Sequence, residues 1–106
     1  MSIFRARGVP YVVCPASTTT KVKVFGGVEA GREDVRGVLH TGVFTNESAS
    51  AVNIDVHDSK LDAPANIIAR IRIPANDTIP VLFNLEFKIG LQVVVPASAR
   101  AVVTVL

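Results

Sequence analysis

The feature that most constrains this 106-residue chain is a repeated short run in which apolar and polar residues alternate. In residues 51–58, for example, Val52, Ile54 and Val56 alternate with polar residues. Alternation places successive side chains on opposite faces of a strand, whereas an amphipathic helix needs a period near 3.6. Val and Ile dominate the apolar residues, and these β-branched side chains pack well on pleated sheets. The chain is therefore predicted to be all-β.

Clusters of Pro, Gly, Asn and Asp separate about eight such runs, spaced roughly 8–14 residues apart. This spacing is typical of an antiparallel β-sandwich, and we expect a jelly-roll-like one. Pro80 lacks a backbone N–H, so its strand should be an edge strand or carry a bulge. The predicted strands cover residues 9–14, 20–25, 35–45 (with a kink at Gly37 or Gly42), 51–58, 66–73, 78–83, 89–95 and 100–106.

The length is that of one domain. We expect residues 1–8 to form an N-terminal arm and residues 9–106 a single β-sandwich domain. The arm holds the apolar Ile3 and Phe4 and the basic Arg5 and Arg7. Termini of this kind are often ordered by a partner, and a disordered terminus is the alternative.

Charge and cysteine content exclude several classes of protein. The 11 Lys and Arg exceed the 9 Asp and Glu by two and are scattered, so no nucleic-acid partner is expected. No run approaches the ~20 apolar residues that cross a bilayer, so no membrane partner is expected either. Cys14 is the only cysteine, which excludes an intrachain disulfide. No long apolar stretch of the kind found in a signal peptide follows residues 2–8. The missing disulfides and the missing apolar stretch together favour an intracellular assembly site over secretion.

No constellation of catalytic residues is evident. The chain has two histidines, His40 and His57, and no Gly-x-Ser-x-Gly or phosphate-binding glycine motif. Cys14 precedes Pro15 in an apolar run, which indicates a buried side chain rather than a reactive thiolate. We therefore expect a protein that is not an enzyme, with no catalytic residue and no cofactor.

One group of acidic and histidine residues could, by residue type, bind a metal ion. Asp55 and His57 should share a strand face, and Asp58 and Asp62 follow. Imidazole and carboxylate are both metal ligands, but the same pattern describes the solvated face of an ordinary strand. The second interpretation is preferred, so no metal site is predicted.

Several strands are apolar on both faces. The side chain of Val94 points to the opposite face of its strand from those of Val93 and Val95, and the side chain of Val102 points to the opposite face from that of Val103. Either a loop covers such a strand, or its outer face meets another chain. A mean hydropathy of +0.42 in so small a domain favours oligomerisation.

The C-terminal part, about residues 67–106, resembles small β-sandwich structural proteins of tailed bacteriophages. The similarity lies in IRIPANDTIP at 71–80, FNLEFKIGLQVVV at 83–95 and AVVTV at 101–105. In that group a strand ends in an IPA turn, a proline-containing strand follows, and a strand of the form F-x-x-G-L-x-V-x-V pairs with a final V-T-V strand. The resemblance implies a virion component without catalytic residues.

The expectation is thus a capsid decoration (cement) protein that stabilises the shell through protein–protein contacts. It would lie on the capsid surface of the virion after assembly in the host cytoplasm. Its partners would be coat or other virion proteins and copies of itself, a trimer being one such form. The predicted partner-binding residues are Ile3, Phe4, Arg5, Arg7, Arg70 and Arg72. The main alternative is a tail- or fibre-associated module that binds a receptor or carbohydrate through loops at 26–34 or 59–65. A small jelly-roll enzyme is a third hypothesis, disfavoured because it needs a histidine-rich metal site.

Overall fold

The computed structural model describes residues 11–23, 35–61 and 64–106. The predicted arm at residues 1–8 and the glycine-containing loop at 26–34 lie outside these ranges. Within them the chain forms strands and connecting turns and no helix. The strands are β1 (Tyr11–Cys14), β2 (Thr18–Lys23), β3 (Gly37–Asn46), β4 (Val52–Asp58), β5 (Ile67–Ile73), β6 (Asp77–Phe87), β7 (Leu91–Val95) and β8 (Ala99–Val105).

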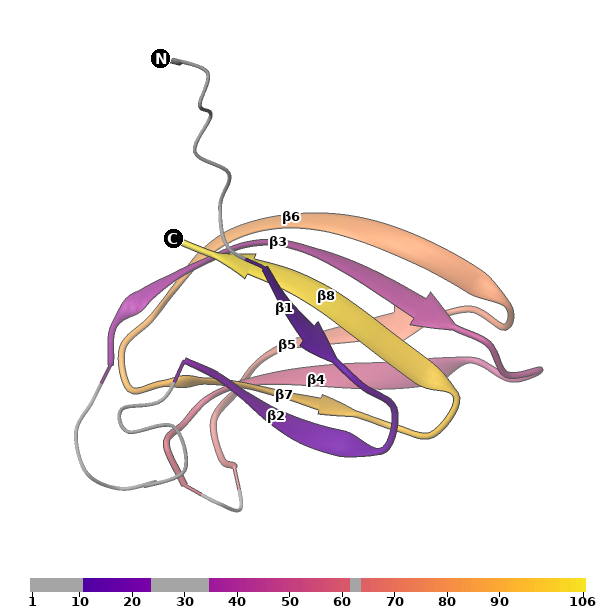
Figure 1. Ribbon diagram of the computed structural model, residues 1–106, viewed down its shortest axis with the longest axis horizontal. Coiled ribbons are helices and arrows are strands. Elements are labelled where there is room, and N and C mark those ends of the chain that lie inside the picture. Colours follow the sequence, from indigo (N-terminus) through magenta and orange to yellow (C-terminus); the bar gives the residue numbers. More distant parts are fainter. Residues whose placement is uncertain (1–10, 24–34, 62–63) are drawn as a thin grey trace, which may run out of the picture.

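These strands form two four-stranded antiparallel sheets. Sheet A has the order β1-β8-β3-β6 and sheet B the order β2-β7-β4-β5 (Figure 1). The first strand pairs with the last, the second with the seventh, the third with the sixth and the fourth with the fifth. A chain folded back on itself in this way and wound into two layers is a jelly roll. The prediction of an all-β, jelly-roll-like sandwich is confirmed.

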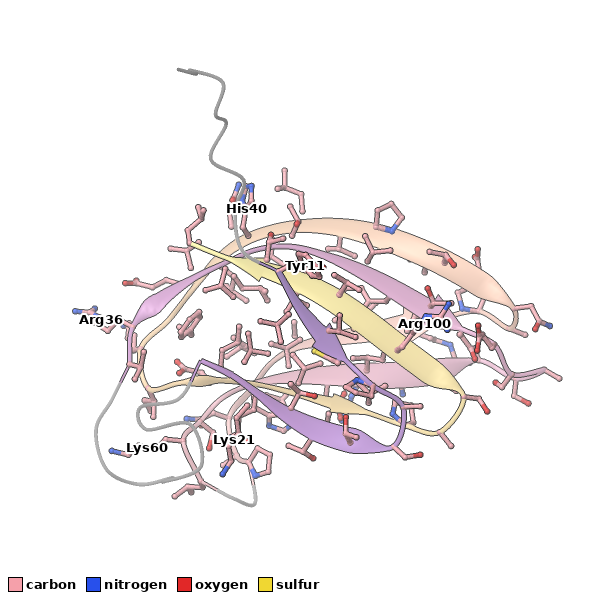
Figure 2. All side chains as sticks on the ribbon, in the orientation of Figure 1. Tyr11, Lys21, Arg36, His40, Lys60 and Arg100 are labelled. Carbon is pink, nitrogen blue, oxygen red and sulfur yellow. The ribbon has the colours of Figure 1, made fainter. Side chains whose placement is uncertain are left out.

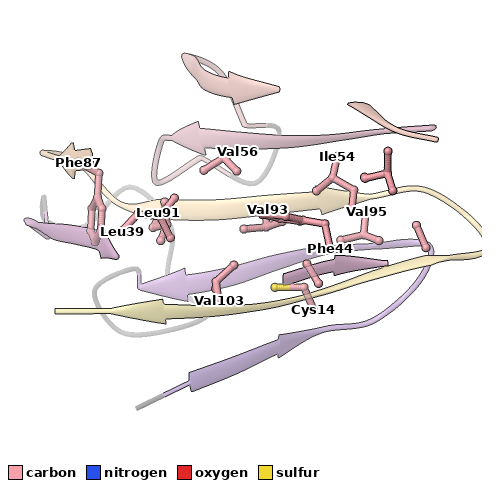
Figure 3. Close-up of a cluster of buried hydrophobic side chains, with 13 residues drawn as sticks. Cys14, Leu39, Phe44, Ile54, Val56, Phe87, Leu91, Val93, Val95 and Val103 are labelled. Carbon is pink, nitrogen blue, oxygen red and sulfur yellow. The ribbon is translucent and has the colours of Figure 1, made fainter. Parts of the chain in front are cut away.

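The core fills the space between the two sheets (Figure 3). Inward positions alternate with outward ones along each strand, which is the pattern from which the strands were predicted. The buried apolar side chains are Cys14, Leu39, Phe44, Ile54, Val56, Ile73, Phe87, Leu91, Val93, Val95, Ala99, Ala101 and Val103.

The strand that contains Pro80 is longer than predicted. β6 runs from Asp77 to Phe87, beyond the expected end at residue 83. Its register against β3 shifts between Leu82 and Leu85, and Asn84 within this interval has a φ of 50°. This irregularity made residues 84–88 resemble a connection. The expected edge position is confirmed, because β6 is the last strand of sheet A.

Two local predictions were wrong. A bulge in β5 shifts the register so that Val56 pairs with Ala69 and His57 with Ile67, which leaves Ile68 against the core and Ile67 exposed. Regular alternation back from the buried Ile73 through Ile71 and Ala69 predicts the reverse, with Ile67 inward and Ile68 outward. In β3 the irregularity lies between Leu39 and Thr41 rather than at a glycine.

Gly42 has a different role in β3. A Cβ atom at this position would lie 2.7 Å from ring atoms of Phe44 and 3.2 Å from Phe83. These two rings meet edge to face with centroids 5.9 Å apart. The glycine therefore makes room for an aromatic pair rather than for a bend.

A buried asparagine joins the turns at one end of the sandwich. The Nδ2 group of Asn46 donates to the carbonyl oxygens of Ser50, Ile73 and Pro74, at 2.8, 3.1 and 3.1 Å. Its Oδ1 accepts from the backbone N–H and the hydroxyl of Ser48. One side chain thus fixes the β3–β4 turn against the end of β5.

Candidate functional site

The outer face of sheet A is the most distinctive surface of the described chain. Cross-strand pairing places Tyr11, Thr104, Thr41 and Leu82 in one row across the sheet. The next row consists of Val13, Val102, Val43 and Pro80, and a third of Arg100, Thr45 and Thr78. We call the ten residues other than Arg100 the sheet A face. They come from four strands that are far apart in the sequence, so only the topology brings them together.

The sheet A face is exposed and largely apolar. Tyr11 is 68% exposed, Val13 52%, Val43 44% and Leu82 67%, so no described segment covers them. Four of the seven large hydrophobic side chains that are exposed in the described residues therefore lie on this one face. A sheet that faces only water normally shows polar residues on its outer side. A contiguous apolar face is typical of a contact surface.

The threonines of this face bond to one another. The hydroxyls of Thr41 and Thr104 are 2.7 Å apart, and the backbone N–H of Thr41 also donates to the Thr104 hydroxyl at 3.1 Å. The hydroxyls of Thr45 and Thr78 are 3.3 Å apart. Because these polar groups have partners within the sheet, covering the face would leave few of them unsatisfied.

Charged groups lie at the two ends of the sheet A face, outside its ten residues. At one end Arg100 pairs with Glu47 at 2.9 Å. At the other end Arg36 pairs with Glu86 at 3.5 Å. Figure 2 shows Tyr11 and His40 on the side formed by sheet A, and Lys21 and Lys60 on the side of sheet B.

The outer face of sheet B is mostly polar, although the exposed Ile67 also lies on it. On it, Arg70 donates to both carboxylate oxygens of Asp55, at 2.7 and 3.2 Å. This hydrogen bonding, followed by the negative charge of Asp55, raises the pKa of the Arg70 guanidinium. Arg72 lies opposite Asn53 and is exposed, with no carboxylate in ion-pairing distance among the described residues.

The structure therefore separates the predicted partner-binding residues. Arg70 is engaged with Asp55, and Arg72 is available on the same edge strand. The four arm residues Ile3, Phe4, Arg5 and Arg7 lie outside the described residues.

The two-sided apolar strands have different surroundings. A loop covers the outer side of β7, where Gln92 is fully buried and donates to the carbonyl oxygens of Ser59 and Leu61, both at 2.8 Å. His57, opposite Gln92, is 7% exposed, and its Nδ1 lies 3.0 Å from the carbonyl oxygen of Ala65. The outer side of β8 lies instead within the exposed sheet A face.

The carboxylates near His57 have partners other than a metal. Asp55 holds Arg70, and Asp58 accepts hydrogen bonds from the backbone N–H groups of Lys88, Ile89 and Gly90. Asp62 lies outside the described residues. Among those described, no three His, Cys, Asp or Glu side chains gather as a metal site would require.

A small pocket lies beside the covering loop. Its volume is about 190 Å³, below the roughly 300–1,000 Å³ that is typical of ligand sites. It is lined by Asp58, Ser59, Lys60, Leu61, Ala65, Asn66 and Ile89. The described part of the loop proposed for carbohydrate binding therefore borders a pocket smaller than is typical of a ligand site.

Cys14 is buried, as the sequence predicted. Burial raises the pKa of its thiol to about 11, and a hydrogen bond with the Thr20 side chain offsets part of this shift. A thiol of this kind is protonated near neutral pH and is a poor nucleophile.

Comparisons with protein-family models, curated proteins and solved structures found no match. The similarity of residues 67–106 to phage structural proteins therefore stays a prediction. The described residues form no helix that could span a bilayer.

Sequence reasoning did not find the sheet A face as a site. It noted the apolar outer side of residues 100–106 but could not pair it with Val13, Val43 and Leu82. The signal in each strand is one or two exposed apolar residues, which are common on any protein surface. The register of all four strands is needed to see that they are contiguous.

Proposed function

We propose that this chain is a structural component of a protein assembly, and specifically a capsid decoration protein of a tailed bacteriophage. In this role it stabilises the shell through protein–protein contacts and performs no catalysis. The observation that carries the first part of the proposal, membership of a protein assembly, is the uncharged, exposed sheet A face, which has the character of a contact surface rather than of a substrate site.

The virion assignment has two further supports. Jelly rolls occur in viral capsid domains, although they also occur in lectins and cupins, so this support is an analogy of fold. The second is the resemblance of residues 67–106 to phage structural proteins. Both favour coat proteins as the proposed partners and the outer capsid surface as the proposed location, after assembly in the host cytoplasm.

Contacts with the shell would use surfaces other than the sheet A face. The arm residues Ile3, Phe4, Arg5 and Arg7 offer apolar anchors and positive charge, and Arg72 adds an exposed guanidinium on the edge strand β5. Basic groups suit an acidic shell surface, since complementary charges speed and orient association.

The proposal is tested by locating the chain in native particles. Particles are purified on a density gradient from a lysate of the source, the copy number is measured by quantitative mass spectrometry, and the position is imaged by cryo-electron microscopy. We expect many copies per particle on the capsid exterior. Recovery only in the free-protein fraction would overturn the proposal, and a few copies confined to the tail would replace it with the receptor-binding alternative.

A functional measurement complements the imaging. Particles stripped of this chain should release their contents at a lower temperature, and adding the purified chain back should restore the original release temperature. Stripped particles that are as heat-stable as complete ones would contradict a stabilising role.

A further inference from the structure

We propose that the sheet A face binds the sheet A face of a second copy of this chain, related by a two-fold axis. This inference rests on the proposed assembly function and deepens it by naming the first partner. It also assigns a place on the molecule to the self-association that the sequence predicts.

The distribution of charge favours a second copy as the occupant. The ten residues of the face carry no ionisable group other than the Tyr11 phenol. The ionisable side chains nearest to them, Arg100 beside Thr45 and His40 beside Thr41, lie towards its two ends, so two such faces can meet without burying an unpaired charge at their centre. Each end of the face carries one arginine and one glutamate, namely Arg100 with Glu47 and Arg36 with Glu86. Because both ends carry both signs of charge, ion pairs between the copies are possible whichever ends a two-fold axis brings together. The surface is therefore complementary to itself, as a two-fold contact requires.

The area is sufficient for a specific but weak contact. With about 3.3 Å per residue and about 4.8 Å between strands, the four strands of sheet A span a flat area of about 500 Å², of which the ten residues of the sheet A face cover about 300 Å². A contact that includes the charged ends of both sheets as well as the two faces buries about 1,000 Å², which is near the lower limit for a specific interface. A monomer–dimer equilibrium in the micromolar range is therefore expected rather than an obligate dimer.

The internal bonding of the face reduces the cost of covering it. The Thr41–Thr104 and Thr45–Thr78 pairs keep their hydroxyls bonded to one another when water is removed. The remaining surface consists mainly of the valines, Leu82, Pro80 and Tyr11. Two antiparallel sheets that pack face to face in this way lie with their strands inclined by about 30°.

The test measures the mass of the full chain by sedimentation equilibrium across the micromolar range. We expect the mass to rise from one copy to two. Val43→Glu, in the second row of the face, should weaken the dimer about tenfold or more, because it places an acidic charge in an apolar contact. Ile67→Glu is the matched control, since Ile67 is a similarly exposed apolar residue on sheet B (49% against 44% for Val43). It should leave the dimer unchanged.

Two further variants separate loss of the contact from loss of the fold and test whether the two copies of Val43 meet. Leu82→Glu, at the 67% exposed edge of the face, replaces Val43→Glu if circular dichroism shows that the latter does not fold. Mixing Val43→Glu with Val43→Lys should restore a dimer, because opposite charges then meet across the contact. This rescue requires the two-fold axis to pass near Val43, in the middle row of the face. A mixture no tighter than either variant alone would overturn that position of the axis, since Val43 would then lie far from its counterpart.

Other outcomes are equally decisive. A strict monomer overturns the inference, and so does a dimer that Ile67→Glu dissociates and Val43→Glu does not. A particle of three copies excludes the two-fold contact. These failures are distinct from failure of the proposed function, because the location of the wild-type chain on native particles is measured in a separate experiment. If the purified chain forms the dimer but is never found on particles, the two-fold contact stands and the decoration role is rejected.

Discussion

The carboxylate of Asp58 accepts a 2.7 Å hydrogen bond from the backbone N–H of Ile89. The same carboxylate accepts from the N–H groups of Lys88 and Gly90. The last residue of β4 in sheet B therefore holds the turn that carries the chain from β6 in sheet A to β7 in sheet B. This contact fixes one end of the sandwich.

Asp58→Ala should lower the free energy of unfolding by about 1–3 kcal/mol, because three backbone donors lose a charged acceptor. Urea unfolding followed by circular dichroism measures the change. Asp77→Ala is the control, since the Asp77 carboxylate accepts a hydrogen bond only from the N–H of its neighbour Thr78 among the described residues. A change in Asp58→Ala no larger than that in the control would show that the turn does not depend on this carboxylate.

Asn46→Ala should be more costly than Asp58→Ala. Asn46 is 1% exposed, and its removal leaves the carbonyl oxygen of Ile73 buried without this donor. We expect a loss of about 2–4 kcal/mol, as is typical when a buried polar network is broken. Asn53→Ala, at an exposed position of β4, should change stability by less than about 0.5 kcal/mol. If Asn46→Ala and Asn53→Ala changed the free energy of unfolding equally, Asn46 would not be the main anchor of these turns.

Gln92→Met should separate local from global stability. The Nε2 of Gln92 holds the loop carbonyls of Ser59 and Leu61, but its buried Oε1 has no partner in the described structure. Methionine of similar length removes one unsatisfied acceptor but leaves the carbonyl oxygens of Ser59 and Leu61 without this donor. The net loss should therefore be about 1–2 kcal/mol, smaller than that of Asn46→Ala. The amide protons of the loop should nevertheless exchange faster. Hydrogen exchange with mass spectrometry checks this, and an unchanged loop would rule out Gln92 as its clamp.

The sequence predicted the strands because their cause is local. Alternation in residues 51–58 reflects a strand with one buried and one outer face, and the structure places Ile54 and Val56 in the core. Pro80 likewise predicted an edge because it lacks a donor for a second neighbour. By contrast, the bulges next to His57 and at Asn84 depend on the partner strand and leave no clear pattern in the sequence.

The sheet A face could not be predicted for a different reason. Val43 becomes part of a contiguous surface because it pairs with Val102 on one side and Pro80 on the other. These pairs join residues that are 59 and 37 positions apart in the sequence. Periodicity indicates that each side chain points outward, but it carries no information on which strands are neighbours.

The buried thiol of Cys14 should make stability depend on alkaline pH. Its pKa is raised from 9.0 to about 11 in the folded chain, so the folded state favours the protonated thiol. Below pH 9 the thiol is protonated in both states and its contribution is complete. Between pH 9 and 11 unfolded chains ionise first, and the contribution is lost as the pH passes the folded-state value. A shift of this size corresponds to about 2–3 kcal/mol.

Comparison with Cys14→Ala isolates the contribution of this thiol from those of all other groups. The difference in unfolding free energy between wild type and Cys14→Ala should be constant up to pH 9 and then fall towards pH 11. In the native state the thiol should also react slowly with a disulfide reagent at pH 8, and rapidly once urea unfolds the chain. A pH-independent difference together with rapid native labelling would mean that Cys14 is accessible, contrary to its position between the two sheets.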